Sequence, residues 1–381
     1  MPLTLVTSSR FADHLMPPGH PERAARAQVM QAVAEKWAAR GVQVLAPRPA
    51  TRDELLRVHT PAYLDQIAGT AGRAVMLDGD TFTSPDTAEV AALAAGAAII
   101  AVDRVLHRPP EARDRPPEAE AASALVFVRP PGHHAEADRG MGFCIYNNIA
   151  IAVAHALARG LTRVAIVDYD VHHGNGTQWR FYDDRRVLFA SMHQFPFYPG
   201  TGSAAETGSA DGEGFTVNVP LEAGATDGDY ALVFDRVILP LLGAFGPELL
   251  FVSAGFDAHM GDPLGGMRVS VEGFNHLASR LHDFASAARC PAIFITEGGY
   301  HLKALGACLD GLASVLLEGR ASVAQPRADE IVPVNGGSPG VEPLTVDEIP
   351  LVEHATARPT HRGPAAIELV RSVQKRYWPG L

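Results

Sequence analysis

The sequence predicts an α/β protein with a mostly parallel central sheet and helices on both faces. From residue 124 to residue 317, short apolar segments alternate with longer segments of helical periodicity. Residues 164–167 are apolar and mostly β-branched, which is typical of a strand buried in the middle of a parallel sheet. Strands that alternate with helices in this way form sheets covered on both sides.

The composition narrows the class of protein. A chain of 381 residues with 47% hydrophobic residues can bury a large core. Its net charge of −11 argues against a nucleic-acid binder. Three widely spaced cysteines are too few for a disulfide framework, and no segment approaches ~18 uninterrupted apolar residues. We therefore expect a cytoplasmic protein that binds neither nucleic acid nor membrane, and its oligomeric state stays open.

The first part of the chain shows local start signals for helices. Thr51 and Glu54 match a capping box, and Ser84 followed by Pro85 is typical of the residues that begin a helix. The predicted elements here are strands at 3–7 and 42–45, a helix that opens at 19–23, runs through 37 and stops before 41, a short helix at 51–59, and a long alanine-rich helix from 84 to 106.

The rest of the chain continues the alternation. The proline-rich residues 108–120 are interpreted as a surface loop within one domain, because a buried strand follows at once. The predicted strands are 124–128, 163–169, 187–191, 215–219, 249–254 and 292–296, and the predicted helices are 147–159, 177–182, 227–242, 270–288 and 302–317. Residues 321–381 are expected to form a wrapping segment that ends in a last helix, 364–377.

Four loops with chemically active side chains follow strands of this sheet. They are Pro-Pro-Gly-His-His at 130–134, Asp170 with His172, Gly-Phe-Asp at 255–257, and Glu-Gly-Gly-Tyr at 297–300. Taken alone, each has an ordinary structural interpretation, such as a turn acid or a tyrosine on a glycine turn. Open parallel sheets bind ligands beyond the carboxyl ends of their strands. Four such loops together therefore favour one common site.

The side chains of these loops suit metal-assisted hydrolysis of an amide. Asp170, His172 and Asp257 offer two oxygens and one nitrogen and leave positions open on a divalent ion, and Zn²⁺ and Fe²⁺ would both be satisfied. Hydrolysis also needs a base and an acid, which one imidazole of a tandem pair can be in turn. Tyr300 could stabilise the developing oxyanion.

At this point the chain resembles the histone deacetylase family, in its bacterial branch that is similar to class II deacetylases and acetylpolyamine amidohydrolases. The resemblance covers roughly residues 1–320 and is carried by Arg-Pro-Pro-Gly-His-His at 129–134, Gly-Phe-Cys at 142–144 with Asn147 and Asn148, residues 168–177, Ser-Ala-Gly-Phe-Asp at 253–257, Gly-Asp-Pro at 261–263 and Glu-Gly-Gly-Tyr at 297–300. It implies a three-layer arginase–deacetylase fold and a single catalytic domain over 1–381.

The resemblance also implies a role for each side chain of the site. His134 would be the general base and then the acid, and Tyr300 would polarise the acyl carbonyl. His133, held by Asp168, would act mainly electrostatically, and Asn175 would orient His134. Zinc would be held by Asp170, His172 and Asp257.

Further residues match the tunnel that receives the acyl-lysine side chain in this family. Phe143 and Tyr198 resemble its walls, and the Gly142 carbonyl would accept the amide N–H of the substrate. The position of Tyr198 is often phenylalanine, so its hydroxyl would narrow or wet the tunnel.

The residue predicted at the mouth of the site helps to distinguish acyl-lysine from acetylpolyamine substrates. Polyamine-cleaving relatives often place an acid where this chain has Leu264, so we favour N-epsilon-acyl-lysine in a protein or peptide, with acetylpolyamine as the alternative. An acid that grips the peptide backbone in some relatives has no secure equivalent here, although Asp80 and Asp86 lie near the right place.

The family further implies structural monovalent cations, usually potassium. One site would use Asp168, Asp170, His172, Ser191 and Met192, partly through backbone carbonyls, and a second would use Phe181, Asp184 and Val187. On sequence alone, Ser191 and Asp184 are equally well explained as a strand-end hydroxyl and a turn acid.

Two other functions are a catalytically silent acyl-lysine reader and a two-manganese ureohydrolase. A catalytically silent acyl-lysine reader would often lack the tyrosine that this chain has at 300. A two-manganese ureohydrolase needs further aspartates, but His173 and Gly174 follow the first ligand pair, and Ala258 and His259 follow Asp257. Both alternatives are therefore less favoured than a zinc-dependent deacetylase.

Overall fold

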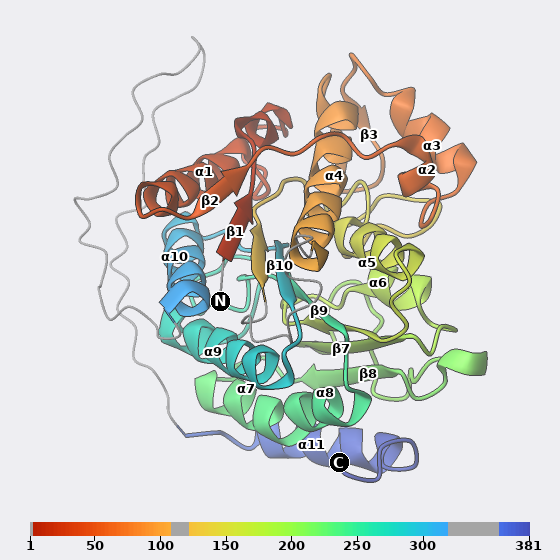
Figure 1. Ribbon diagram of the computed structural model, residues 1–381, viewed down its shortest axis with the longest axis vertical. Coiled ribbons are helices and arrows are strands. Elements are labelled where there is room, and N and C mark those ends of the chain that lie inside the picture. The colour runs from red at the N-terminus through yellow and green to blue at the C-terminus, as the bar shows by residue number, and fades with distance from the viewer. Residues whose placement is uncertain (1–2, 108–121, 319–357) are drawn as a thin grey trace.

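The protein is built around an eight-stranded parallel sheet, which confirms the predicted fold class. The computed structural model describes residues 3–107, 122–318 and 358–381. Its strand order is β2-β1-β5-β10-β9-β6-β7-β8, and every neighbouring pair is parallel (Figure 1). The strands are β1 (Leu3–Val6), β2 (Gln43–Leu45), β5 (Ser123–Val126), β6 (Val164–Asp168), β7 (Val187–Gln194), β8 (Thr216–Leu221), β9 (Leu249–Ala254) and β10 (Ala292–Thr296).

Helices cover both faces of the sheet and bury two apolar cores. Side chains alternate along β6: Ala165 and Val167 join one core, whereas Val164 and Ile166 join the other, as the two-residue period of a strand requires. The first core is covered by α1 (Ala24–Ala39), α7 (Asp227–Val233), α8 (Leu239–Phe245), α9 (Val271–Ala288), α10 (Leu302–Glu318) and α11 (Arg362–Gln374), and the second by α2 (Arg52–Leu55), α3 (Pro61–Ala68), α4 (Thr87–Leu106) and α5 (Asn148–Ala158) (Figure 1).

The strand order brings the four loops of the predicted site together. The strands β5, β10, β9 and β6 are consecutive neighbours, although β10 comes last in the chain. Their carboxyl ends lie level, because Asp168 pairs in register with Ser253, and Ile295 with Val126. A short helix, α6 (Asn175–Arg180), follows the loop after β6.

Three local predictions differ from the structure. The capping box at Thr51 is present, but α2 ends at Leu55, and a separate helix, α3, begins after Thr60. The helix α4 begins at Thr87 behind Asp86, so Ser84 is not its cap; the Ser84 hydroxyl instead lies 3.0 Å from the Thr87 hydroxyl. The predicted helix 227–242 contains a π-helical turn, Phe234–Ile238, before α8.

A small hairpin and the last helix lie outside the main alternation of strands and helices. The small hairpin of β3 (Val75–Met76) and β4 (Phe82–Thr83) was not predicted. The last helix, α11, is tied to β8, because the Gln374 side chain donates to the Thr216 carbonyl at 2.8 Å.

Within the described residues, no helix has the length and hydropathy needed to span a membrane. The predicted loop 108–120 and residues 321–357 of the wrapping segment lie outside the described residues.

A fully buried group of charges connects the amino-terminal segment to the sheet. The Glu22 carboxylate accepts hydrogen bonds from Arg129, one of them at 2.7 Å, and from Arg26 at 3.0 Å, and all three side chains are inaccessible to solvent. Arg26 also donates to the backbone carbonyls of Glu297 and Gly299, in the loop after β10. One carboxylate therefore pairs with two guanidinium groups beneath the predicted site.

Removing this carboxylate is expected to destabilise the protein strongly. Breaking a buried ion pair from one side costs about 3–5 kcal/mol, because the partner charge stays buried without compensation. We expect Glu22→Gln to lower the free energy of unfolding, measured with urea at pH 7, by about this amount. Glu54→Gln, which removes a carboxylate from the more exposed partner Arg48, is the control and should cost less. Equal losses in the two variants would contradict the assignment.

The same carboxylate predicts an acid dependence of stability. Burial raises the pKa of Glu22, but the guanidinium of Arg129, followed by that of Arg26, lowers it overall from 4.5 to about 2. A depressed pKa stabilises the fold above the unfolded-state value, and this stability is lost as the pH falls from about 4.5 towards 2. In urea titrations over this range, Glu22→Gln should lose less stability than the wild type. Parallel losses would count against the pair.

Candidate active site

Three side chains from two neighbouring strands form a compact group of metal-ligand type. Asp170 and His172 follow β6, and Asp257 follows β9. The His172 Nδ1 atom lies 3.2 Å from Asp170 Oδ1 and 3.1 Å from Asp257 Oδ2. The potential ligand atoms of the three residues all lie within 4.8 Å of one another, and among the described residues no other such group occurs.

The electrostatics of this group fit a divalent cation. Burial, followed by the neighbouring carboxylate of Asp170, raises the pKa of Asp257 to about 7, although His172 acts in the opposite direction. Burial opposes the charge on His172, but hydrogen bonds to Asp170 and Asp257 raise its pKa to about 10. Two buried carboxylates that share one imidazole thus require positive charge between them. Two oxygens and one nitrogen suit Zn²⁺ or Fe²⁺, which would replace that proton.

The tandem histidines differ in charge. Burial lowers the pKa of His134 well below its usual range, and His133 and His172 lower it further. Burial also acts against charge on His133, yet the carboxylates of Asp168 and Asp170 raise its pKa to about 10. The His133 Nδ1 atom lies 3.0 Å from Asp168 Oδ2. His133 is therefore cationic, whereas His134 is neutral and can accept a proton.

Asn175 determines which nitrogen of His134 carries the hydrogen. The Asn175 amide donates to Glu136 Oε1 at 2.7 Å, so its oxygen, Oδ1, faces His134 Nδ1 at 2.8 Å. An amide oxygen can only accept, so His134 Nδ1 carries the hydrogen and Nε2 keeps its lone pair. This is the tautomer that a general base requires.

The Tyr300 loop passes very close to the two acids. The Gly298 N–H donates to Asp170 Oδ2 at 2.8 Å, and a Cβ atom at this position would lie 2.0 Å from Asp257 Oδ2. Only glycine permits this approach. Burial raises the pKa of Tyr300 well above its usual range, so its hydroxyl remains a hydrogen-bond donor. The guanidinium of Arg26 lies 5.0 Å from the centre of its ring.

Aromatic side chains surround the histidines and Tyr300. The ring of Phe143 lies edge-on to Tyr300 at 5.7 Å, and the ring of Tyr198 lies edge-on to His134 at 5.2 Å. Phe143 has a positive φ of 68°, and Gly142 before it has a φ of 56°. The Gly142 carbonyl accepts only a weak bond from the Cys144 thiol, at 3.4 Å. Phe143 and Tyr198 thus both reach the predicted site.

Three side chains were considered for the predicted mouth of the site: the candidate rim acids Asp80 and Asp86, and Leu264. Asp80 is half-buried, and its charge helps to raise the pKa of Tyr198, after burial as the main cause. Asp86, in contrast, precedes α4 and lies 4.0 Å from Arg10. Of the two candidate rim acids, only Asp80 acts electrostatically on the tunnel residue. Leu264 is partly exposed, and its N–H donates to Asp262 Oδ1 at 3.0 Å.

The residues of the two expected potassium sites are engaged with other groups. Ser191 pairs in register with Asp168, and its hydroxyl lies 2.9 Å from His193 Nδ1. The Asp184 carboxylate pairs with Arg186 at 2.6 Å, which leaves backbone carbonyls as the ligands of the second site. Met192 lies in β7 beside Ser191, and Phe181 and Val187 flank the turn that holds Asp184. Both potassium sites stay predictions.

Some residues that build the site were not singled out from the sequence. Glu297 Oε2 accepts the backbone N–H groups of Gly132 at 2.6 Å and of His133 at 3.1 Å, which fixes the histidine loop. Phe197 stacks on the His172 ring at 5.4 Å. Glu297 lies in one of the recognised motifs, so its acid between a strand and two glycines was a usable signal. No sequence pattern indicated that Phe197 stacks on His172.

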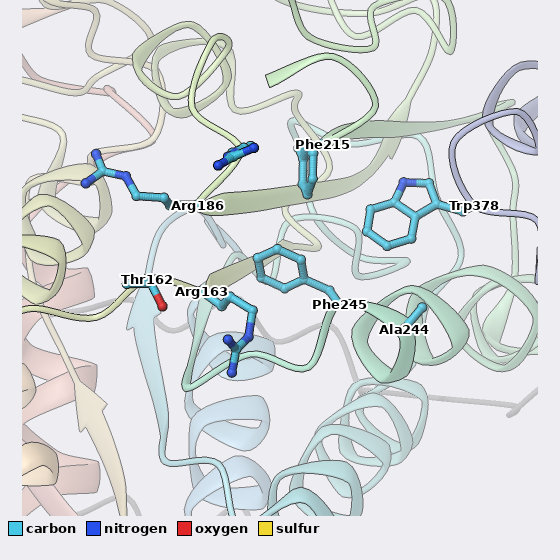
Figure 2. A pocket seen from close by; sticks show the side chains of 8 residues that line it. Thr162, Arg163, Arg186, Phe215, Ala244, Phe245 and Trp378 are labelled. Atoms are coloured by element: carbon cyan, nitrogen blue, oxygen red, sulfur yellow. The ribbon is translucent and has the colours of Figure 1, made fainter. Parts of the chain in front are cut away.

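A separate pocket lies at the opposite edge of the sheet. Its lining residues precede β6, β7 and β8 or come from the carboxyl-terminal part of the chain; they are Thr162, Arg163, Arg185, Arg186, Phe215, Ala244, Phe245 and Trp378 (Figure 2). Arg186 forms a salt bridge with Asp184, and the Arg163 guanidinium donates to the Gly246 carbonyl at 2.8 Å. None of the lining residues belongs to the metal-ligand group. This pocket is therefore distinct from the metal-ligand group.

Comparisons with known proteins place this geometry in a family. The histone deacetylase domain matches residues 20–316. The chain belongs to the histone deacetylase family. It is 37% identical over 304 residues to a "Probable deacetylase" of Archaeoglobus fulgidus, covering 78% of this chain and 81% of that protein. The crystal structure of the HDA15 HD domain superimposes with a TM-score of 0.80 at 32% identity, covering 99% of this chain and 96% of that chain.

A relative that is named for a different substrate is also similar. The polyamine deacetylase HDAC10 of Homo sapiens is 40% identical over 275 residues, which cover 68% of this chain and 39% of that protein. The family makes this protein a hydrolase, and the buried Asp170, His172 and Asp257 form a group suited to a metal ion. Family membership alone does not select between lysine and polyamine substrates.

Loss of one acid from the metal-ligand group is expected to release the metal. Asp257→Ala should reduce zinc content, measured by elemental analysis after dialysis, from about one ion per chain to well below one, because it removes one of three protein ligands. Asp229→Ala, which removes a buried acid elsewhere, should keep its zinc. Full zinc occupancy in Asp257→Ala would refute the ligand role of Asp257.

Proposed function

We propose that this protein is a zinc-dependent amidohydrolase that removes acetyl or other acyl groups from N-epsilon-acyl-lysine of proteins or peptides. The observation that carries the proposal is the pairing of a neutral His134, with a free Nε2 lone pair, with the buried group of Asp170, His172 and Asp257. Tyr300 adds a protonated hydroxyl at the same edge of the sheet. Base, metal ligands and oxyanion donor are thus supplied by different loops.

Each side chain then has a defined task. When bound by Asp170, His172 and Asp257, the metal supplies Lewis acidity, which lowers the pKa of water and polarises a carbonyl. His134 Nε2 removes a proton from the attacking water and later delivers it to the amine nitrogen as the C–N bond breaks. The Tyr300 hydroxyl donates to the carbonyl oxygen as negative charge develops there. The products are a carboxylate and a free amine.

Two further groups support this reaction. The cationic His133 lies beside His134, with ring centres 4.0 Å apart, and stabilises negative charge in the site without giving up its own proton. The Gly142 carbonyl, which accepts only the weak Cys144 bond, remains able to accept the N–H of the substrate amide. Both groups act on the charge and orientation of the substrate.

The mouth of the site favours acyl-lysine over acetylpolyamine. Leu264 offers no charge to a second ammonium group, so a polyamine cation there would lack a partner. Acetylpolyamine remains the second candidate, supported by the similarity to HDAC10 and by the Asp80 carboxylate near Tyr198. We also propose a cytoplasmic location, which is consistent with the free thiols of Cys144, Cys290 and Cys308.

Loss of the Tyr300 hydroxyl should reduce turnover without affecting the metal. Removing one oxyanion donor typically lowers kcat by about 10²–10³-fold, and we expect this for Tyr300→Phe on an acetyl-lysine peptide. Zinc content should stay at the wild-type level, because Tyr300 is not a ligand. Near-normal turnover would remove Tyr300 from the mechanism, and an inactive wild type that still binds the peptide would favour a silent reader.

A panel of substrates tests the preference at the mouth. Zinc-loaded protein should hydrolyse acetyl-lysine peptides with higher kcat/KM than acetylated polyamines, because Leu264 provides no acid for a second cation. Longer acyl-lysine peptides in the same panel give the acyl-chain preference. Faster cleavage of acetylpolyamines would overturn the choice of acyl-lysine and leave the amidohydrolase chemistry intact.

A further inference from the structure

The Tyr300 loop is held by a buried acid that has no task in the reaction described above. Asp262 is 7% exposed, and no Lys, Arg or His forms a salt bridge with it in the described part of the chain. Its Oδ2 atom accepts the N–H of Tyr300 at 2.6 Å and the N–H of His301 at 3.1 Å. Burial raises the pKa of Asp262, and these backbone donors, followed by the charge of Arg26, oppose that shift and stabilise the carboxylate.

The N–H groups of Tyr300 and His301 lie at the start of helix α10. His301 immediately precedes α10 and accepts the Leu305 N–H, so its own N–H is one of the unpaired donors at the start of this helix, and the Tyr300 N–H comes directly before it. Helix α10 packs against α1 and α9 and is therefore a rigid platform. Asp262 comes from the loop after β9, so it caps α10 from a distant part of the chain.

The same carboxylate holds a second part of the site. Its other oxygen, Oδ1, accepts the N–H of Leu264 at 3.0 Å, and Leu264 is the residue predicted at the mouth. The loop that carries Tyr300 and the loop that carries Leu264 therefore share one anchor. The other hydrogen bonds of the Tyr300 loop hold Gly298, through Asp170, and the Gly299 carbonyl, through Arg26. The Tyr300 ring itself contacts the Arg26 guanidinium and Phe143.

We propose that Asp262 is a positioning residue that fixes the Tyr300 hydroxyl for catalysis and couples it to the Leu264 mouth. The inference rests on the proposed amidohydrolase function. It differs from a purely structural helix cap in one respect: loss of Asp262 should act on the rate through Tyr300. A misplacement of about 1 Å can cost about 10²-fold in rate.

A matched control exists in the same chain. Asp229 is also buried and also accepts three backbone N–H groups, from Thr226 at 2.9 Å, Thr360 at 2.8 Å and Gly363 at 2.9 Å. It holds α11 against α7, away from the site. Asp262→Ala and Asp229→Ala should therefore both lower the thermal unfolding temperature, whereas only the first should lower kcat.

The rate loss is traced to Tyr300 with an activated substrate. A trifluoroacetyl group draws electrons from the carbonyl, so its hydrolysis depends less on an oxyanion donor than hydrolysis of an acetyl group does. We expect kcat on the acetyl substrate to fall about 10–100-fold in Asp262→Ala, with normal zinc content. The ratio of trifluoroacetyl to acetyl turnover should rise in both Asp262→Ala and Tyr300→Phe and stay unchanged in Asp229→Ala.

Two further variants make the test decisive. On the trifluoroacetyl substrate, adding Asp262→Ala to Tyr300→Phe should slow turnover by less than about twofold, because the two changes remove one effect. Asp262→Asn keeps one acceptor oxygen and should recover part of the acetyl activity. Multiplicative losses in the double variant, or an unchanged turnover ratio in Asp262→Ala, would overturn the proposal.

The assay also separates this inference from the proposed function. All variants are compared on the acyl amide that the wild type cleaves, whether acetyl-lysine or acetylpolyamine. An acetyl-lysine peptide that the wild type does not hydrolyse contradicts the proposed substrate. An active wild type whose Asp262→Ala variant behaves like Asp229→Ala contradicts the positioning role alone.

Discussion

The site depends on the adjacency of four parallel strands, β5, β10, β9 and β6, whose carboxyl ends lie level in the sheet. β10, the last of these strands in the chain, lies between β5 and β9. Residues more than a hundred positions apart are thereby brought within hydrogen-bonding distance, as Gly298 and Asp170 are. Without this strand order, the ligands, the base and the tyrosine would not face one another.

Because these side chains are buried, their close neighbours determine which of them carry charge. Acids that would be equivalent in water differ here: Asp168 supports a cationic His133, whereas Asp170 and Asp257 share His172. The positive charge on His133 in turn helps to keep His134 neutral. The base and the electrostatic partner are therefore distinguished by their neighbours, although both are histidines in one loop. A divalent ion would complete this balance beside the two shared acids.

Local patterns predicted much of the fold. The apolar residues 164–167, the capping box at Thr51 and the alternation of strands and helices depend on near neighbours, so the sequence displays them directly. Ser84 was misjudged because its hydroxyl has tertiary partners, among them the Leu15 N–H at 3.0 Å, which a local pattern does not show. The four site loops were found because each carries its chemistry on the residues that follow a strand.

Long-range partners were harder to foresee. Glu22 suits the start of a helix in sequence, yet in the structure its carboxylate pairs with Arg26 and Arg129, and Arg129 is 107 positions away. Phe197 and Asp262 also act only through residues that the fold brings to them. Residue types near a strand end thus predict the reacting groups, whereas the groups that hold them in place depend on the complete fold.

The most direct test of the account is to locate the metal. Diffraction data collected at the zinc absorption edge from crystals of the zinc-loaded protein should show an anomalous peak in bonding contact with Asp170, His172 and Asp257, with Tyr300 and His134 facing the same ion. An active, zinc-containing protein with no anomalous peak between these three side chains would contradict it.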